Sequence, residues 1–148
     1  MDGVWPYLFR GTSLGWPGNK TMQKIGLTPT STDPLVATFF AMKSNQHGEG
    51  VVYYARWEDF KDRFGLPNVL EHRECEVVLS MLPIEFARLA KGYIPVQKAR
   101  EILVSMGFQV PTAIADRGYL TTAINQIDRW LTREELRSFW YALIGEKQ

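Results

Sequence analysis

Three polar groups in this chain have residue types that could do chemistry together. Arg10 follows a short apolar run, hydroxyl residues cluster at 30–32, and the carboxylates Glu74 and Glu76 stand two positions apart. An arginine offers a planar fork of donors that suits phosphate or carboxylate oxygens. Two neighbouring carboxylates repel each other, so they are usually held together to meet a cation, share protons or contact hydroxyls. The plainer alternatives are a solvated or structurally paired arginine and an exposed acidic face of an edge strand.

The residues around Arg10 predict a strand that runs into a polar loop. The apolar run 5–9 is the strand candidate, and residues 12–19 carry two glycines, a proline and small polar residues. Such a composition is typical of a loop, and a loop here could wrap a ligand. Gly11 has no Cβ, so a ligand could approach the backbone closely at this position.

The two carboxylates fall in another predicted strand, residues 74–81. Small and apolar residues alternate there with more polar ones, and successive side chains of a strand point to opposite faces. A strand would therefore put Glu74 and Glu76 on one face and Cys75 on the inner face. Cys75 is expected to be a small core residue rather than a reactive thiol.

Strands and short helices alternate up to residue 81, and only helical patterns follow from residue 83. Asp33 before Pro34 is typical of a helix start, with an acid at the N-cap and proline at the first helical position. Thr132 and Glu135 have the spacing of a capping box, which predicts a helix over 132–144. This order indicates a single α+β domain, residues 1–148, with a helical C-terminal portion. The other expected elements are strands at 27–31, which Pro29 makes an edge strand or a strand end, and at 51–55, with helices at 20–25, 57–64, 84–90, 96–106 and 121–131.

The composition is that of an ordinary globular chain, and it restricts the chemistry. A formal net charge of +1 gives no general reason to expect a nucleic-acid or membrane partner. One cysteine and two histidines supply a metal site poorly, so we expect a site without metal. The sequence shows neither a signal-peptide pattern nor a long apolar run, which predicts a soluble, cytoplasmic protein.

In their order along the chain, the three groups resemble the arginine, Ser-Thr-Ser and Glu-x-Glu motifs of the mono-ADP-ribosyltransferases. The matching stretches are Tyr-Leu-Phe-Arg-Gly-Thr-Ser at 7–13, Gly-Leu-Thr-Pro-Thr-Ser-Thr-Asp-Pro-Leu-Val-Ala-Thr-Phe-Phe-Ala at 26–41, and Glu-Cys-Glu-Val-Val-Leu at 74–79. The similarity covers residues 5–81, whereas the mainly helical part, 82–148, matches no family motif. The resemblance implies an ADP-ribosyltransferase-like fold, a split mixed or antiparallel sheet with flanking helices.

Members of this family split NAD at the nicotinamide glycosidic bond and pass ADP-ribose to a protein, a nucleic acid or a small molecule. The resemblance therefore implies a glycosyl-transferring enzyme of the toxin or effector kind. NAD would be its substrate, no metal would be needed, and an unidentified macromolecule, in the first place a protein, would be the acceptor.

The resemblance also assigns roles to residues of the first two motifs. Arg10 would hold an NAD phosphate, Gly11 would meet the nicotinamide amide through its backbone, and Thr12 would lie beside them in the same site. A hydroxyl of the second motif would support the catalytic acid. Depending on the register, the first serine of that motif falls on a proline or on Thr30, so both Thr30 and Ser31 stay candidates.

The third motif would carry out the reaction. By resemblance, Glu76 is the catalytic acid, and Glu74 orients or deprotonates the acceptor, as in members that modify arginine. The residue type suits this chemistry, because breaking the bond develops positive charge on the ribose, which a fixed carboxylate stabilises. An aromatic side chain, Phe39, Phe40 or Trp16, could cover the nicotinamide ring, although phenylalanines on such a helix are more often core residues.

Two other functions would use the same residues. One is an NAD glycohydrolase, in which water replaces the macromolecular acceptor. The other is a non-catalytic module with a degenerate transferase fold, in which the stretch around Arg10 only binds a phosphate or nucleotide. The spacing from Arg10 to Ser31 is shorter than in larger toxin relatives, so an adenine pocket would be reduced or built differently.

Overall fold

The structure, a computed structural model, describes residues 6–14, 26–45, 48–67, 75–114 and 117–145. Its centre is an open antiparallel sheet of six strands in the order β4-β5-β2-β1-β3-β6. The predicted α+β class is therefore confirmed. The strands are β1 (Tyr7–Ser13), β2 (Thr28–Ser31), β3 (Gly50–Arg56), β4 (Phe64–Pro67), β5 (Glu76–Leu79) and β6 (Gly92–Pro95).

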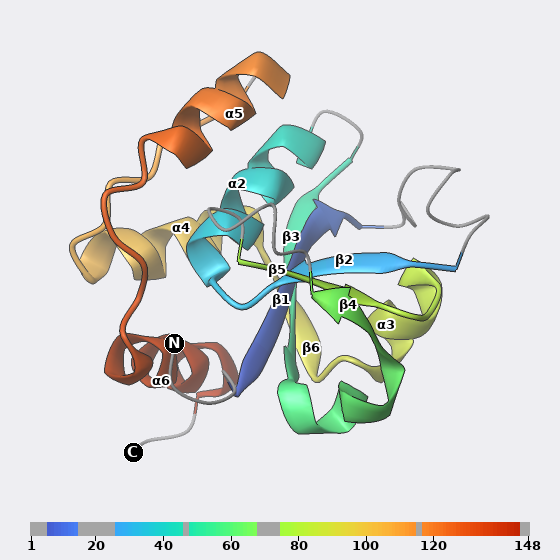
Figure 1. The fold of residues 1–148 in the computed structure, drawn as a ribbon. Helices are drawn as coiled ribbons and strands as arrows, with labels where there is room; N and C mark the ends of the chain where they lie inside the picture. Colours follow the sequence, from blue (N-terminus) through green and yellow to red (C-terminus); the bar gives the residue numbers. More distant parts are fainter. Residues whose placement is uncertain (1–5, 15–25, 46–47, 68–74, 115–116, 146–148) are drawn as a thin grey trace.

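The sheet consists of two halves that meet between β1 and β2. In one half β1 pairs along its whole length with β3, from Tyr7 opposite Arg56 to Ser13 opposite Gly50. The two halves share one register pair, Phe9 opposite Ser31. Figure 1 shows β2 running across the direction of β1 and β3. The backbones of β1 and β2 therefore separate on either side of this pair, and their polar groups need other partners there.

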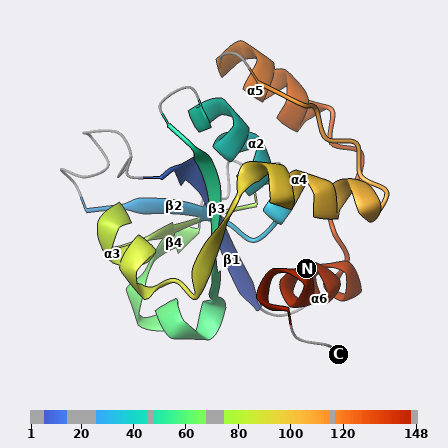
Figure 2. The ribbon, with the colours of Figure 1, turned by 180° about the vertical axis from the view of Figure 1, so that it is seen from behind.

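Helices cover both faces of the sheet (Figures 1 and 2). On one face lie α2 (Pro34–Ser44), α4 (Val96–Ser105), α5 (Arg117–Asn125) and α6 (Arg133–Ile144), and their apolar side chains form the larger core with those of β1, β3 and β6. On the other face lie the 3-10 helix η2 (Trp57–Arg63) and α3 (Pro83–Leu89), around a smaller core. Among the described residues no helix is long and apolar enough to cross a membrane.

Helix α2 is the central helix of the larger core, and it approaches the sheet at two glycines. A Cβ on Gly11 would lie 1.7 Å from the carbonyl oxygen of Ala37, and one on Gly50 would lie 2.4 Å from that of Ala41. Neither position has room for a side chain, because the helix backbone fills the space. The sequence suggested that Gly11 admits a ligand, and the structure gives its missing side chain another reason, the close packing of α2 on β1.

Asp33 joins the start of α2 to the start of α6. Its carboxylate accepts hydrogen bonds from the Leu35 N–H at 2.8 Å and from the Leu131 N–H at 3.1 Å. The predicted N-cap at Asp33 and the predicted capping box of Thr132 with Glu135 are both confirmed. Desolvation of the buried carboxyl raises the pKa of Asp33 to about 6, in spite of the two hydrogen bonds, which lower it. Asp33 is therefore a buried carboxyl group that links the starts of α2 and α6 through hydrogen bonds.

Several predicted boundaries are wrong because pairing between distant segments extended or created strands. Strand β1 continues to Ser13, so Arg10 lies within the strand and not at its end. Residues 64–67 pair with β5, and residues 92–95 pair with β3, although the sequence suggested a helix end and a purely helical C-terminal part. Helix α5 spans Arg117–Asn125 rather than 121–131. The predicted helix 20–25 lies outside the described residues.

The first prediction concerns the packing of α2 on β1. Replacing Gly11 by alanine should lower the free energy of unfolding by about 3 kcal/mol or more, at the upper end for overpacked cores, because the new methyl group meets helix backbone that cannot rotate away. Urea denaturation followed by circular dichroism measures this. The control is Gly107→Ala, where the added Cβ would have no other atom within 4 Å. This variant should lose only about 1–2 kcal/mol of unfolding free energy, the cost of a left-handed backbone for a residue with a side chain. Equal losses in the two variants would contradict the packing argument.

The second prediction concerns the pH dependence of stability. Because the pKa of Asp33 is about 6 in the fold and ordinarily 3.8, the folded protein keeps a proton between these values that the unfolded chain has lost. Stability relative to Asp33→Asn should therefore fall by about 3 kcal/mol as pH rises from about 4 to about 6, and then stay constant. Urea denaturation of both proteins between pH 4 and pH 8 gives the difference. A difference independent of pH would show that the Asp33 carboxyl titrates normally.

Candidate functional site

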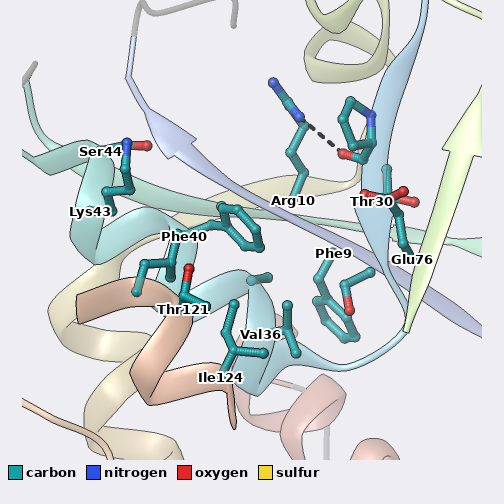
Figure 3. Close-up of a pocket in the computed structure, with 15 residues that line it drawn as sticks. Phe9, Arg10, Thr30, Val36, Phe40, Lys43, Ser44, Glu76, Thr121 and Ile124 are labelled. Carbon is teal, nitrogen blue, oxygen red and sulfur yellow. Dashed lines mark hydrogen bonds between the residues drawn. The ribbon is translucent and has the colours of Figure 1, made fainter. Parts of the chain in front are cut away.

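A cavity of about 380 Å³ lies where the two halves of the sheet meet. Its walls come from β1, β2 and β5 on one side and from α2 and α5 on the other (Figure 3). A volume of this size is at the lower end for small-molecule sites, about 300–1,000 Å³. The lining residues are Phe9, Arg10, Gly11, Pro29, Thr30, Ser31, Val36, Ala37, Phe40, Lys43, Ser44, Glu76, Leu120, Thr121 and Ile124.

The register of three strands brings the second and third motifs together. Ser31 lies opposite Phe9 of β1 on one side and opposite Glu76 of β5 on the other. Residues opposite each other in adjacent antiparallel strands point to the same face, with Cβ atoms about 5 Å apart. The sequence could not decide between Thr30 and Ser31 as the neighbour of Glu76. The register places Ser31 in that position.

The hydroxyl groups of the second motif have different partners. Thr30 is buried, and its Oγ1 donates to the carbonyl oxygen of Val77 at 2.7 Å, which ties β2 to β5. Ser31 Oγ accepts the backbone N–H of Asp33 at 3.1 Å. That bond holds the Ser31 hydroxyl against the N-cap residue of α2. Thr30 thus has a structural bond within the sheet, and Ser31 lies between Asp33 and Glu76.

Arg10 occupies the gap between the two halves of the sheet. Its Nη1 donates to the carbonyl oxygen of Pro29 at 3.0 Å. In a strand the N–H and the C=O of one residue point to the same side. The C=O of Pro29 faces β1, so the missing N–H of the proline is also on the β1 side. No residue of β1 is in register with Pro29 there, and the missing donor therefore costs the sheet no hydrogen bond. This explains why β2 lies inside the sheet although Pro29 predicted an edge or a strand end. Arg10 replaces the missing strand partner with a side chain.

Arg10 remains a cation in this position. Desolvation lowers the pKa of Arg10 to about 10, which leaves the side chain protonated at neutral pH. A guanidinium has five N–H donors, and the contact with Pro29 uses one of them. Lys43, in the last turn of α2, adds a second cationic side chain to the cavity wall. A ligand with phosphate or carboxylate groups suits these charges.

The segment before Glu76 differs from the predicted strand. Strand β5 begins at Glu76, and Cys75 lies in a turn with a φ of 48°, a left-handed conformation that is uncommon for residues other than glycine. The Cys75 carbonyl oxygen accepts the N–H of Thr32 at 3.1 Å. Cys75 is only half-buried, and desolvation raises the pKa of its thiol to about 11. The prediction for Glu74 concerns a residue outside the described part of the chain.

The other predicted site residues fall partly inside the cavity. Gly11 and Phe40 line it. Thr12 is buried in β1 opposite Val51 and is not among the lining residues. Phe39 is a core residue, so the two phenylalanines have different roles, and Trp16 lies outside the described residues.

Several lining residues were not identified from the sequence. Lys43 follows Phe40 at the helical spacing of three, which was a usable signal, because such residues share one face of a helix. The residues of α5, Leu120, Thr121 and Ile124, carry no comparable signal, since they reach the cavity only through tertiary packing. Among the described residues no group of three histidine, cysteine, aspartate or glutamate side chains could hold a metal ion.

Comparisons with known proteins return no relatives. No protein-family model matches the chain, and no match was found among curated proteins or among solved structures. A functional proposal for this protein therefore rests on the three motifs and on the geometry of the cavity.

The third prediction concerns the anion contact of Arg10. If the guanidinium binds a pyrophosphate, Arg10→Ala should weaken NAD binding about 10- to 100-fold, as expected for a hydrogen bond to a charged group. Arg10→Lys should have a smaller effect, because lysine keeps the charge but loses the planar fork. Isothermal titration calorimetry with NAD measures all three proteins. Thermal melting of each controls for loss of the Pro29 contact, and equal NAD affinities in three folded proteins would contradict the phosphate contact.

Proposed function

We propose that this protein is an NAD-dependent mono-ADP-ribosyltransferase, which cleaves the nicotinamide glycosidic bond and transfers ADP-ribose to a macromolecule, in the first place a protein. The observation that carries the proposal is the meeting of three sequence motifs in one cavity. Arg10, Ser31 and Glu76 come from three different strands and line the same space. The division of the sheet into two halves between β1 and β2 is compatible with the split sheet that the resemblance implies.

The proposed reaction needs charge stabilisation more than any other assistance. When the bond between nicotinamide and ribose C1′ breaks, the bonding electron pair leaves with nicotinamide and positive charge develops on the ribose. A nucleophile of the acceptor then bonds to C1′ and passes its proton to a general base, a role that the resemblance offers for Glu74. In the proposed mechanism the carboxylate of Glu76 stabilises the developing charge, and the register of Ser31 opposite Glu76 supports a role for its hydroxyl beside that carboxylate.

The two cations support the binding of the rest of the substrate. Arg10 would hold the pyrophosphate, and Lys43 lies on the opposite wall of the same cavity, as Figure 3 shows. The side chain of Phe40 lines the same cavity and offers an aromatic surface for a flat ring (Figure 3). Gly11 presents backbone rather than a side chain to this space, in keeping with a contact to the carboxamide of nicotinamide.

Release of nicotinamide from NAD tests the activity. Purified protein is incubated with NAD alone and with NAD plus cell lysate, and free nicotinamide and protein-bound ADP-ribose are measured. Release that requires lysate, together with labelled macromolecules, supports a transferase. Release without lysate and without labelling supports a glycohydrolase. No release under either condition, with NAD still bound, supports a non-catalytic nucleotide-binding module.

The fourth prediction assigns the main chemical role to Glu76. Glu76→Gln should lower nicotinamide release by about two to four orders of magnitude, because the neutral amide loses several kcal/mol of transition-state stabilisation. NAD affinity should change much less, since the carboxylate acts mainly on charge that develops in the reaction. The control is Glu101→Gln, an exposed acid on α4. A Glu76→Gln protein with the rate of the wild type would remove Glu76 from the catalytic role.

A further inference from the structure

Helix α5 closes the cavity from the side opposite the motif strands. It comes from the C-terminal part of the chain, to which the sequence assigned no place in the site. Leu120 and Ile124 are only 5% and 6% exposed, and they belong to the same core cluster that Phe40 packs against. Thr121, an exposed residue, also lines the cavity (Figure 3). The site is therefore built from both parts of the chain.

The chemistry of the two sides of the cavity differs. The strand side carries Arg10 and Glu76, which suit charged and hydroxylated groups. The helix side carries Lys43 and Ser44 at the end of α2 and Thr121 on α5, and the rest of its lining is apolar. Leu120 and Ile124 lie four residues apart on one face of α5, and Val36 and Phe40 of α2 join them. A ligand that fills the whole space therefore has a polar, anionic portion joined to a flat apolar portion.

We propose that α5 is the wall that contacts the nicotinamide ring, with Thr121 limiting the size of the group that fits. This inference rests on the proposed function. In NAD the nicotinamide is bonded directly to the carbon that Glu76 would face, so this ring must lie within the same cavity. Adenine is separated from that carbon by two riboses and two phosphates, and a cavity of about 380 Å³ is too small for the whole dinucleotide.

The test fills the cavity from α5 without changing the motif residues. Thr121→Tyr places a large side chain on a wall of the cavity, and Thr122→Tyr places the same side chain at a neighbouring exposed position that does not line it. Binding of free nicotinamide and of ADP-ribose is measured separately by NMR titration of the full chain, and thermal melting reports folding. Thr121→Leu provides a smaller filling change if the tyrosine variant does not fold.

The expected result is selective loss of nicotinamide binding. Thr121→Tyr should weaken nicotinamide about tenfold or more and ADP-ribose less than about threefold, because steric fit in such a pocket accounts for changes of this size. Thr122→Tyr should bind both as the wild type does. If Thr121→Tyr and Thr122→Tyr bind nicotinamide equally, or if Thr121→Tyr loses ADP-ribose as strongly as nicotinamide, the inference is wrong while the proposed function stands. If the wild type neither binds nor cleaves NAD, the proposed function itself is wrong.

Discussion

The close approach of α2 to the sheet at Gly11 and Gly50 is the contact on which the other parts of the structure depend. At both positions the backbone of the helix occupies the volume that a side chain would need, so the distance between helix and strands is set by backbone atoms, which cannot adjust by rotation about side-chain bonds. This distance places Phe40 and Lys43 of α2 across the cavity from Arg10. A wider separation would enlarge the cavity and also open the core that α2 shares with α4, α5 and α6.

Asp33 connects this central helix to the C-terminal part of the chain. Its carboxylate bonds to backbone N–H groups at the starts of both α2 and α6, and its own N–H is bonded to Ser31 Oγ beside Glu76. A buried carboxyl is expensive in free energy unless it is hydrogen-bonded, and the raised pKa of Asp33 reflects that cost. The same residue therefore follows the hydroxyl cluster 30–32, caps the start of α2 and holds the segment that leads into α6. This connection between the motif-bearing part and the helical part lies next to the candidate catalytic carboxylate.

The sequence predicted best those features that depend on neighbouring residues. The N-cap at Asp33, the capping box at Thr132 and the strand around Val52 are confirmed because each is encoded within a few positions. Features that depend on distant pairing were missed, namely the extension of β1 to Ser13, the short strands β4 and β6, and the α5 wall of the cavity. The motifs did indicate that Arg10, Ser31 and Glu76 belong together. The choice of Ser31 over Thr30 as the neighbour of Glu76 needed the strand register, which no local pattern contains.

The position of Pro29 explains why the two halves of the sheet separate beside the cavity. Because Pro29 has no N–H, β2 cannot continue its ladder with β1 beyond the pair of Phe9 and Ser31. The carbonyl oxygen left on that side is satisfied by Arg10, whose long side chain reaches across the separation. This bond holds one edge of the guanidinium fork and so fixes the direction of its remaining donors. Pro29, which the sequence placed at an edge or a strand end, thus separates the two halves of the sheet, and the separation both borders the cavity and orients the guanidinium of Arg10 in its wall.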